Sequence, residues 1–200
     1  MGLMASEKSG SDFPSCPAGT HVARCRWVVD IGTQEGQFGA KHQCIIGWEL
    51  PHCLIVDGER KGEPYFLSTY YTMSLHEKAN LRQDLEAWRG QDFTEEELDG
   101  FDLKTIAGVP CLLSVIHKEK KAGGKAARVG GVMALPSGTV CPDAVNPEII
   151  WDFDKPDDNA LDALPEWVQK KIKEAPEWGC DPNDPKEHTP PPADGDDIPF

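Results

Sequence analysis

The sequence lacks any long apolar run. No stretch approaches the roughly 18 consecutive apolar residues that a membrane-spanning helix needs. Hydrophobic residues nevertheless make up 39% of the 200 residues and aromatic residues 8%, which is sufficient for an ordinary globular core. We therefore expect a cytoplasmic globular protein with no membrane partner.

Closely spaced cysteine pairs are also missing. Seven cysteines stand at positions 16, 25, 44, 53, 111, 141 and 180, an odd number without a Cys-x-x-Cys motif, and no secretory signal pattern begins the sequence. This usage predicts free, mostly buried thiols in a reducing compartment. His42-x-Cys44 and His52-Cys53 do not have the spacing of a zinc motif. We predict no metal and no other cofactor.

No catalytic motif can be identified. Gly123-Gly124-Lys125 lacks the first glycine of a phosphate-binding loop and the Ser or Thr after its lysine. Acidic runs such as Glu95-Glu96-Glu97 or Asp152-x-Asp154 are possible ligands of a nuclease metal. Acidic residues in the first turn of a short helix are more simply explained by the helix dipole. We predict that the protein is not an enzyme, with a metal-dependent nuclease as the less favoured alternative.

Positive charge is scarce overall but unevenly distributed. The net charge is −14, yet residues 1–141 carry 15 Lys and Arg against 18 Asp and Glu. Residues 142–174 carry 4 against 9, and residues 175–200 carry 1 against 7. Most of the negative charge therefore lies in the last third, and the nearly neutral front can hold a local basic groove.

Composition also divides the chain. Residues 1–19 are rich in Ser, Gly and Pro and predict a flexible arm, and residues 20–174 predict one domain. Residues 175–200 contain seven prolines and few apolar side chains. Because such a segment cannot repay its ordering entropy, it predicts a disordered, acidic tail.

An alternation of apolar residues predicts a first strand over Thr20–Ile31. Ala23, Cys25, Trp27 and Val29 recur at every second position, so they should share one apolar face with arginines on the other. Four further strands follow from apolar, β-prone runs. They are His42–Leu50, Tyr65–Thr72, Val109–Lys118 and Lys125–Leu135.

Helices are predicted between the third and fourth strands and near the end. Ser74 and Glu77 form a capping-box pattern whose helix ends at Gly90. Thr94 and Glu97 form a second such pattern, ending at Gly100, with Phe93 and Leu98 as its hydrophobic staple. Pro165 opens a last helix that runs through Lys173.

Three strands, a helical region and a two-stranded hairpin are the element order of an OB-fold, a five-stranded barrel. The predicted class is therefore mainly β with helical insertions (α+β). Two loops of that fold flank an oligonucleotide face, and here they would be Gly32–Lys41 and Lys118–Lys125. The segment His117–Arg128 holds five of the fifteen cations of residues 1–141.

Single-stranded DNA is bound by cations along its backbone and by aromatic side chains that stack on its bases. The candidate cations are Arg24, Arg26, Lys41, Lys118, Lys120, Lys121, Lys125 and Arg128. The candidate stacking residues are Phe38, Trp48, Tyr70 and Tyr71. Core packing is the competing interpretation for Trp48, and a solvated strand face for Arg24 and Arg26.

The last residues carry a resemblance to a known family. Asp196-Asp197-Ile198-Pro199-Phe200 resembles the acidic C-terminal tip of bacterial single-stranded DNA-binding proteins. In that family the tip recruits replication, recombination and repair enzymes, which implies the same partners here. The implied tip residues are Asp194, Asp196, Asp197, Ile198, Pro199 and Phe200.

The middle of the chain is similar to small phage-encoded proteins of the same type. The similar segments are His76–Leu81, Trp88–Gly90 with Phe93–Thr94, and Gly100–Leu103. The resemblance implies a phage protein that coats single-stranded DNA in the cytoplasm of a bacterial host, and it leaves a homo-oligomer open. A strand-annealing recombination factor and an adaptor that uses the tip without binding DNA stay open as alternatives.

Overall fold

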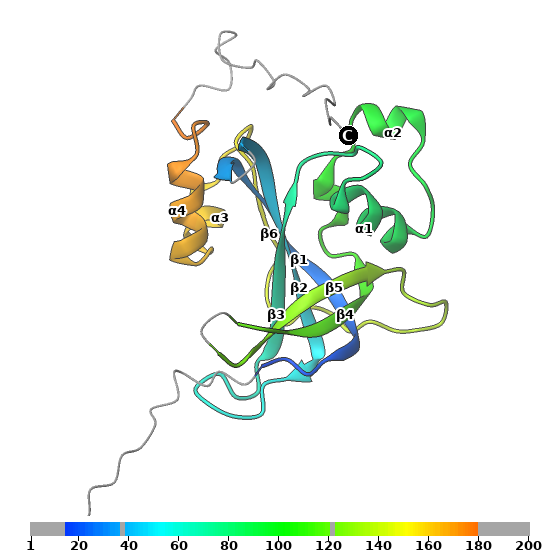
Figure 1. The fold of residues 1–200 in the computed structure, drawn as a ribbon. Coiled ribbons are helices and arrows are strands. Elements are labelled where there is room, and N and C mark those ends of the chain that lie inside the picture. The colour runs from blue at the N-terminus through cyan, green and yellow to red at the C-terminus, as the bar shows by residue number, and fades with distance from the viewer. Residues whose placement is uncertain (1–14, 37–38, 121–122, 180–200) are drawn as a thin grey trace, which may run out of the picture.

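The computed structural model describes residues 15–36, 39–120 and 123–179 (Figure 1). In this part of the chain six strands form one mainly antiparallel sheet that is not closed. The strands are β1 (Gly19–Gly36), β2 (Gly39–Leu54), β3 (Pro64–Thr72), β4 (Pro110–Glu119), β5 (Lys125–Met133) and β6 (Ile149–Trp151). The predicted mainly-β class with helical insertions is confirmed.

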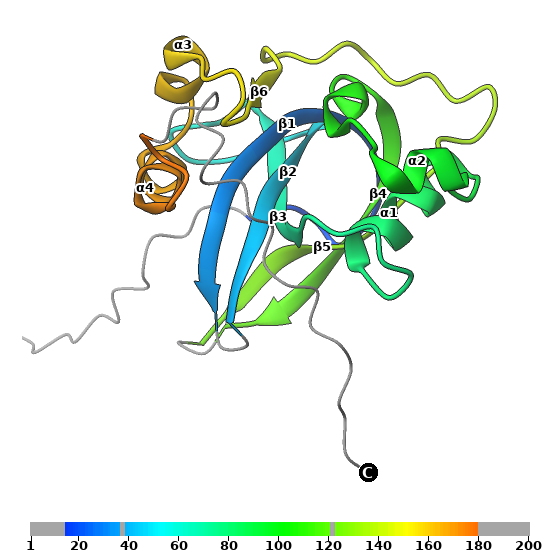
Figure 2. The ribbon, with the colours of Figure 1, turned by 90° about the horizontal axis from the view of Figure 1, so that it is seen from above.

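Helices cover the strands from two sides. They are α1 (Asn80–Arg89), α2 (Glu95–Asp99), the 3-10 helix η1 (Leu103–Ile106), α3 (Asp158–Asp162) and α4 (Glu166–Glu174). In both ribbon views α1 and α2 lie on one side of β1 and β2, and α3 and α4 lie on the other (Figures 1 and 2). No helix in the described ranges is long and apolar enough to span a membrane.

The hydrogen-bonded order of the strands is β3-β2-β1-β4-β5. β1 therefore occupies the centre, antiparallel to β2 and to β4, and it also pairs in parallel with β6. β3 and β5 stand at the two ends of this order but contact each other in space. The sheet thus curves back on itself without a backbone ladder between its end strands.

A bulge in β1 separates two hydrophobic cores. The register with β2 shifts between Cys25 and Trp27, so the face of each following residue is reversed. Cys25 and Val28 lie in the first core, whereas Trp27 and Val29 lie in the second. The prediction of one continuous apolar face along this strand was wrong, because strict alternation ignores the extra residue.

The first core lies between the inner face of the strands and α1. From α1 it contains Leu81, Leu85 and Trp88, and the ring of Trp88 packs 6.0 Å from that of Trp48. The predicted inward face of β2 is confirmed. It consists of Cys44, Ile46, Trp48 and Leu50.

The second core lies under α3, α4 and β6 on the opposite face of β1 and β2. It joins Ile45 of β2 to Trp151 of β6 and to Val168 and Ile172 of α4. The buried carboxylate of Glu49 fixes the loop that leads to β6, accepting hydrogen bonds from the backbone N–H groups of Val145 (2.6 Å) and Asn146 (3.2 Å). Neither β6 nor α3 was predicted.

The two capping-box predictions had opposite outcomes. Thr94 caps α2 and Glu97 bonds back to it, as predicted, and the chain leaves the helix at Gly100. The first box was wrong, because α1 begins only at Asn80 and the Ser74 hydroxyl accepts from the N–H of His76 instead. That helix does end at the predicted Gly90, whose φ of 69° is the left-handed conformation glycine favours.

The predicted loop Gly32–Lys41 is mostly strand. β1 continues to Gly36 and β2 begins at Gly39, and these two glycines pair with each other in the sheet. Gly32 marks an irregularity in β1 rather than a loop: its φ is +66°, and a Cβ there would come within 2.6 Å of the Cβ of Ala175. Phe38, predicted in this loop, lies outside the described residues.

The domain extends further than 20–174 at both ends. Cys16 is buried, and the carbonyl of Cys16 lies 2.8 Å from Nε2 of His117. Ala175 is buried, and the Trp178 ring stacks on that of Trp151 at 6.3 Å. The described cysteines are free, as predicted, and four of them are buried. Cys180 lies outside the described residues.

Glu177 attaches this C-terminal segment to the sheet. Its carboxylate accepts hydrogen bonds from the N–H and the hydroxyl of Thr33 and lies 3.8 Å from Nδ1 of His42. The pKa of His42 is raised, chiefly because Asp30 accepts a hydrogen bond from its ring and also because Asp30 and Glu177 are negatively charged. Burial alone would raise the pKa of Glu177, but the hydrogen bonds from Thr33 outweigh it, so this pKa is lowered.

We predict that the domain needs residues 175–179. A chain ended after residue 174 loses the Glu177 contacts and the Trp178 ring, which should cost about 2 kcal/mol and lower the melting temperature by about 4–8 °C. A chain ended after residue 179 is the matched control and should melt like the full-length protein. Equal melting of the two truncated chains would contradict the role given to this segment.

Candidate nucleic-acid interface

The β4–β5 hairpin carries a cluster of exposed cations. Lys118, Lys120, Lys125 and Arg128 are all exposed, and β4 and β5 pair Lys118 with Ala126 and Glu119 with Lys125. No described carboxylate lies within 4.0 Å of these four cationic groups. Their charge is therefore available to an anion. Lys121, predicted in the same cluster, lies outside the described residues.

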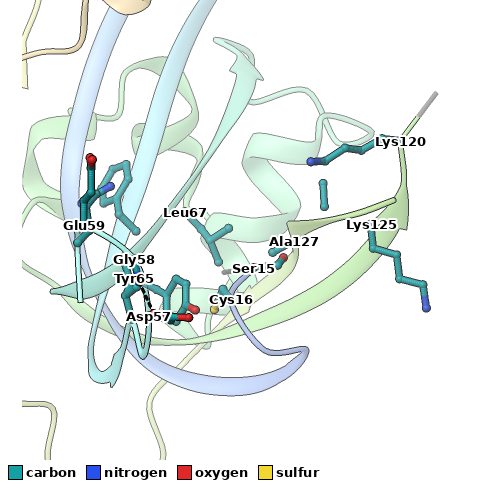
Figure 3. A pocket seen from close by; sticks show the side chains of 14 residues that line it. Ser15, Cys16, Asp57, Gly58, Glu59, Tyr65, Leu67, Lys120, Lys125 and Ala127 are labelled. Carbon is teal, nitrogen blue, oxygen red and sulfur yellow. Dashed lines mark hydrogen bonds between the residues drawn. The ribbon is translucent and has the colours of Figure 1, made fainter. Parts of the chain in front are cut away.

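A pocket of about 550 Å³ opens between this hairpin and β3. Figure 3 shows Tyr65 beside Cys16, with Lys120 and Lys125 on the two arms of the hairpin and Lys125 extending outward. The facing wall is not uniformly basic, because the β2–β3 turn contributes Asp57 and Glu59. The further lining residues are Ser15, Ile55, Gly58, Arg60, Phe66, Leu67, Ala126 and Ala127.

A second hollow of about 350 Å³ lies further along the same two strands, where residues 69–71 of β3 and residues 129–131 of β5 meet Asn80, Gln83 and Asp84 of α1. The first pocket brings residues 65–67 of β3 together with residues 126 and 127 of β5. β3 and β5 therefore run side by side in the same direction. No backbone hydrogen bond joins them in the described part of the chain. The two strands are therefore separated by a seam that no backbone ladder closes.

Tyr70 stands on the outer face of β3 beside the seam. Its side chain is 46% exposed, and its ring lies 6.2 Å from that of Trp167 in α4. Lys171 Nζ lies 5.5 Å from the Tyr70 ring centre. Burial raises the pKa of the Tyr70 hydroxyl, and the cation of Arg128 counteracts that rise from the other side of the seam. Tyr70 is thus an aromatic surface with a cation on each side.

Arg24 is not available to DNA. Its guanidinium donates to the carbonyls of Gly108 (2.6 Å), Cys141 (3.2 Å) and Pro142 (3.1 Å), and the side chain is 20% exposed. These bonds hold together two loops that are far apart in sequence. The prediction of Arg24 as a DNA contact is corrected: it is a structural arginine.

Arg26 is partly committed to the fold as well. Its Nε donates to the carbonyl of Pro147 at 2.9 Å, and its guanidinium lies 5.6 Å from the centre of the Phe66 ring. Burial lowers its pKa. Lys41, by contrast, is exposed on β2 opposite Gln34, and its role as a DNA contact stays a prediction.

Two predicted stacking residues face the core. Trp48 is 1% exposed and packs against Trp88, so it offers no face to a base and is removed from the interface. Tyr71 is 5% exposed, and its hydroxyl donates to Asp84 at 2.6 Å. Successive side chains of a strand point to opposite faces of the sheet. Tyr71 therefore points inward, and its neighbour Tyr70 points outward.

The sequence predictions missed Trp167 and Lys171. The two residues are four apart on α4 and so lie on one helix face, next to the buried face formed by Val168 and Ile172. A tryptophan beside the apolar stripe of an amphipathic helix was the available signal. Its proximity to β3 depends on tertiary packing and carries no local sequence signal.

Two comparisons of the sequence with known proteins gave no match. No protein-family model matches the chain, and no curated protein gives a significant match. Within the described ranges, no group of three or more His, Cys, Asp or Glu side chains is placed to hold a metal ion. The tip residues 194–200 lie outside the described residues.

Arg24 and Arg128 should respond oppositely to substitution. Arg24→Met leaves three carbonyls without their donor, so we expect a loss of about 3 kcal/mol and a melting temperature about 6–12 °C lower. Arg128→Met removes an exposed cation and should change stability by less than about 0.5 kcal/mol. Thermal unfolding of both variants measures this, and an unchanged melting temperature for Arg24→Met would show that its hydrogen bonds are dispensable.

Proposed function

We propose that the protein is a single-stranded DNA-binding protein built on an OB-type barrel. The arrangement of the strands supports the barrel: β1 pairs with both β2 and β4, α1 and α2 come between β3 and β4, and β3 and β5 lie side by side. In this fold the strand surface next to the β4–β5 loop binds oligonucleotides. The open seam between β3 and β5 lies next to that loop.

The observation that carries the proposal is the exposed Tyr70 among unpaired cations. Stacking on an aromatic ring requires a base whose face is free, as in a single strand, and it tolerates any sequence. Lys118, Lys120, Lys125 and Arg128 supply the charge that binds the phosphate backbone. Both features favour non-specific coating of single-stranded DNA over recognition of a duplex.

The acidic tip supports a second part of the proposal, recruitment of partner enzymes. The apolar Ile198 and Phe200 beside Asp196 and Asp197 suit a partner pocket that has apolar walls and basic groups at its rim. We propose that the protein coats single strands during phage replication or recombination in the host cytoplasm and presents residues 194–200 to replication, recombination and repair enzymes.

We predict salt-dependent binding of oligo-dT through the hairpin. Four to six phosphate contacts give a slope of log affinity against log salt of about −3 to −4. A triple variant should weaken binding to DNA of any sequence and flatten this slope by about 0.7 per lost contact. It combines Lys120→Ala, Lys121→Ala and Lys125→Ala. Lys155→Ala, an exposed lysine near α3, is the control and should bind normally.

Fluorescence anisotropy at several salt concentrations, with single-stranded and duplex DNA, makes this measurement. Equal affinity for the two DNA forms, or no effect of the three hairpin substitutions, would contradict the proposed interface. Pairing of added complementary strands would instead identify a strand-annealing factor.

Deletion of Phe200 should abolish binding to a host enzyme that recognises bacterial single-stranded DNA-binding protein tips. The deletion removes the aromatic ring that would fill the apolar pocket of the partner. Affinity for oligo-dT should stay unchanged, which serves as the internal control. Pull-down or calorimetry with such an enzyme tests this, and equal binding of the full-length and shortened chains would show that the resemblance of the tip is accidental.

A further inference from the structure

α4 is held rigidly against the sheet, so its neighbouring face has a fixed position. Val168 and Ile172 are fully buried in the second core, and Gln169 donates from its side chain to the carbonyl of Leu164 at 2.8 Å. Trp167 and Lys171 lie next to this buried face and are directed along the outer surface of β3. The helix that closes the second core therefore also forms one wall beside Tyr70.

Two large rings remain half exposed where this wall meets the sheet. Trp167 is 44% exposed and Tyr70 is 46% exposed, although the apolar second core is immediately adjacent. Their centroids are 6.2 Å apart and their planes are inclined by 57°, so neither ring covers the face of the other. The pair is a contiguous aromatic surface that is partly open to solvent.

Cations border this aromatic surface on both sides. Lys171 Nζ lies above the Tyr70 ring and 3.4 Å from Oε1 of Gln34, and no described carboxylate lies within 4.0 Å of it. On the same helix, Lys170 and Glu174 pair with each other at 3.6 Å. Arg128 lies on the opposite side, across the seam, where its charge acts on the Tyr70 hydroxyl.

We propose that Tyr70 and Trp167 stack on an unpaired nucleobase and that Lys171 and Arg128 bind the phosphates on either side of it. The ligand class is a single-stranded polynucleotide, which would run from the β4–β5 hairpin across β3 to α4. The C-terminal β6-α3-α4 segment is then part of the binding site and not only a cover for the second core. This inference rests on the proposed function and extends it to residues outside the barrel.

Tryptophan emission can report this contact directly. Trp27, Trp48, Trp88 and Trp151 are buried, whereas Trp167 and Trp178 are 44% and 41% exposed. Saturating oligo-dT should quench the wild-type emission through Trp167. Trp167→Phe should bind oligo-dT almost normally, because a ring remains to stack, but should lose most of the quenching. Trp178→Phe is the matched control and should keep it.

Affinity supplies the second measurement. Trp167→Ala and Tyr70→Ala should each weaken oligo-dT binding by about 5- to 150-fold, the range for loss of one stacked base. Wild-type affinity in Trp167→Ala, or full quenching in Trp167→Phe, would overturn the inference while leaving the proposed function intact. Failure of the wild-type protein to bind oligo-dT would overturn both. If Trp167→Ala does not fold, the fluorescence quenching measured with Trp167→Phe still tests whether Trp167 stacks on a base.

Discussion

The length of β1 is the constraint on which the rest of the structure depends. One strand pairs with β4 through its first residues, with β6 through Trp27–Val29 and with β2 along most of its length. The bulge after Cys25 reverses the direction of the side chains, so the same strand supplies both hydrophobic cores. Because β1 is shared in this way, the first core can close around α1 while the outer face still binds α3 and α4.

In our proposal this arrangement also determines where a polynucleotide can bind. α3, α4 and β6 cover the outer face of β1 and β2, which leaves β3, the open seam and the β4–β5 hairpin exposed. Tyr70 lies where the covered and the open surfaces meet, within reach of cations from α4 and from β5. In our proposal the second core thus has two roles: it stabilises the sheet and it places Trp167 at the edge of the interface.

Local signals allowed correct predictions where the deciding contacts are local. The Thr94–Glu97 capping box and the strand pattern of β2 depend on neighbours within a few residues. The bulge in β1, the start of α1 and the three-residue β6 depend on distant partners, and the sequence patterns failed there. The same limit applies to the predicted site residues. The sequence around Arg24 looks the same whether the arginine binds a phosphate or donates to the distant carbonyl of Pro142, as it does here.

Mapping of DNA crosslinks onto the protein tests the central claim most directly. Oligo-dT that contains photoreactive bromodeoxyuridine can be crosslinked to the full-length chain, and the attached peptides can be identified by mass spectrometry. Our account predicts crosslinks in β3 at Tyr70 and in the β4–β5 hairpin, on one continuous surface. Crosslinks concentrated on α2, which lies on the side of β1 and β2 opposite α3 and α4 and lines neither hollow, would contradict it.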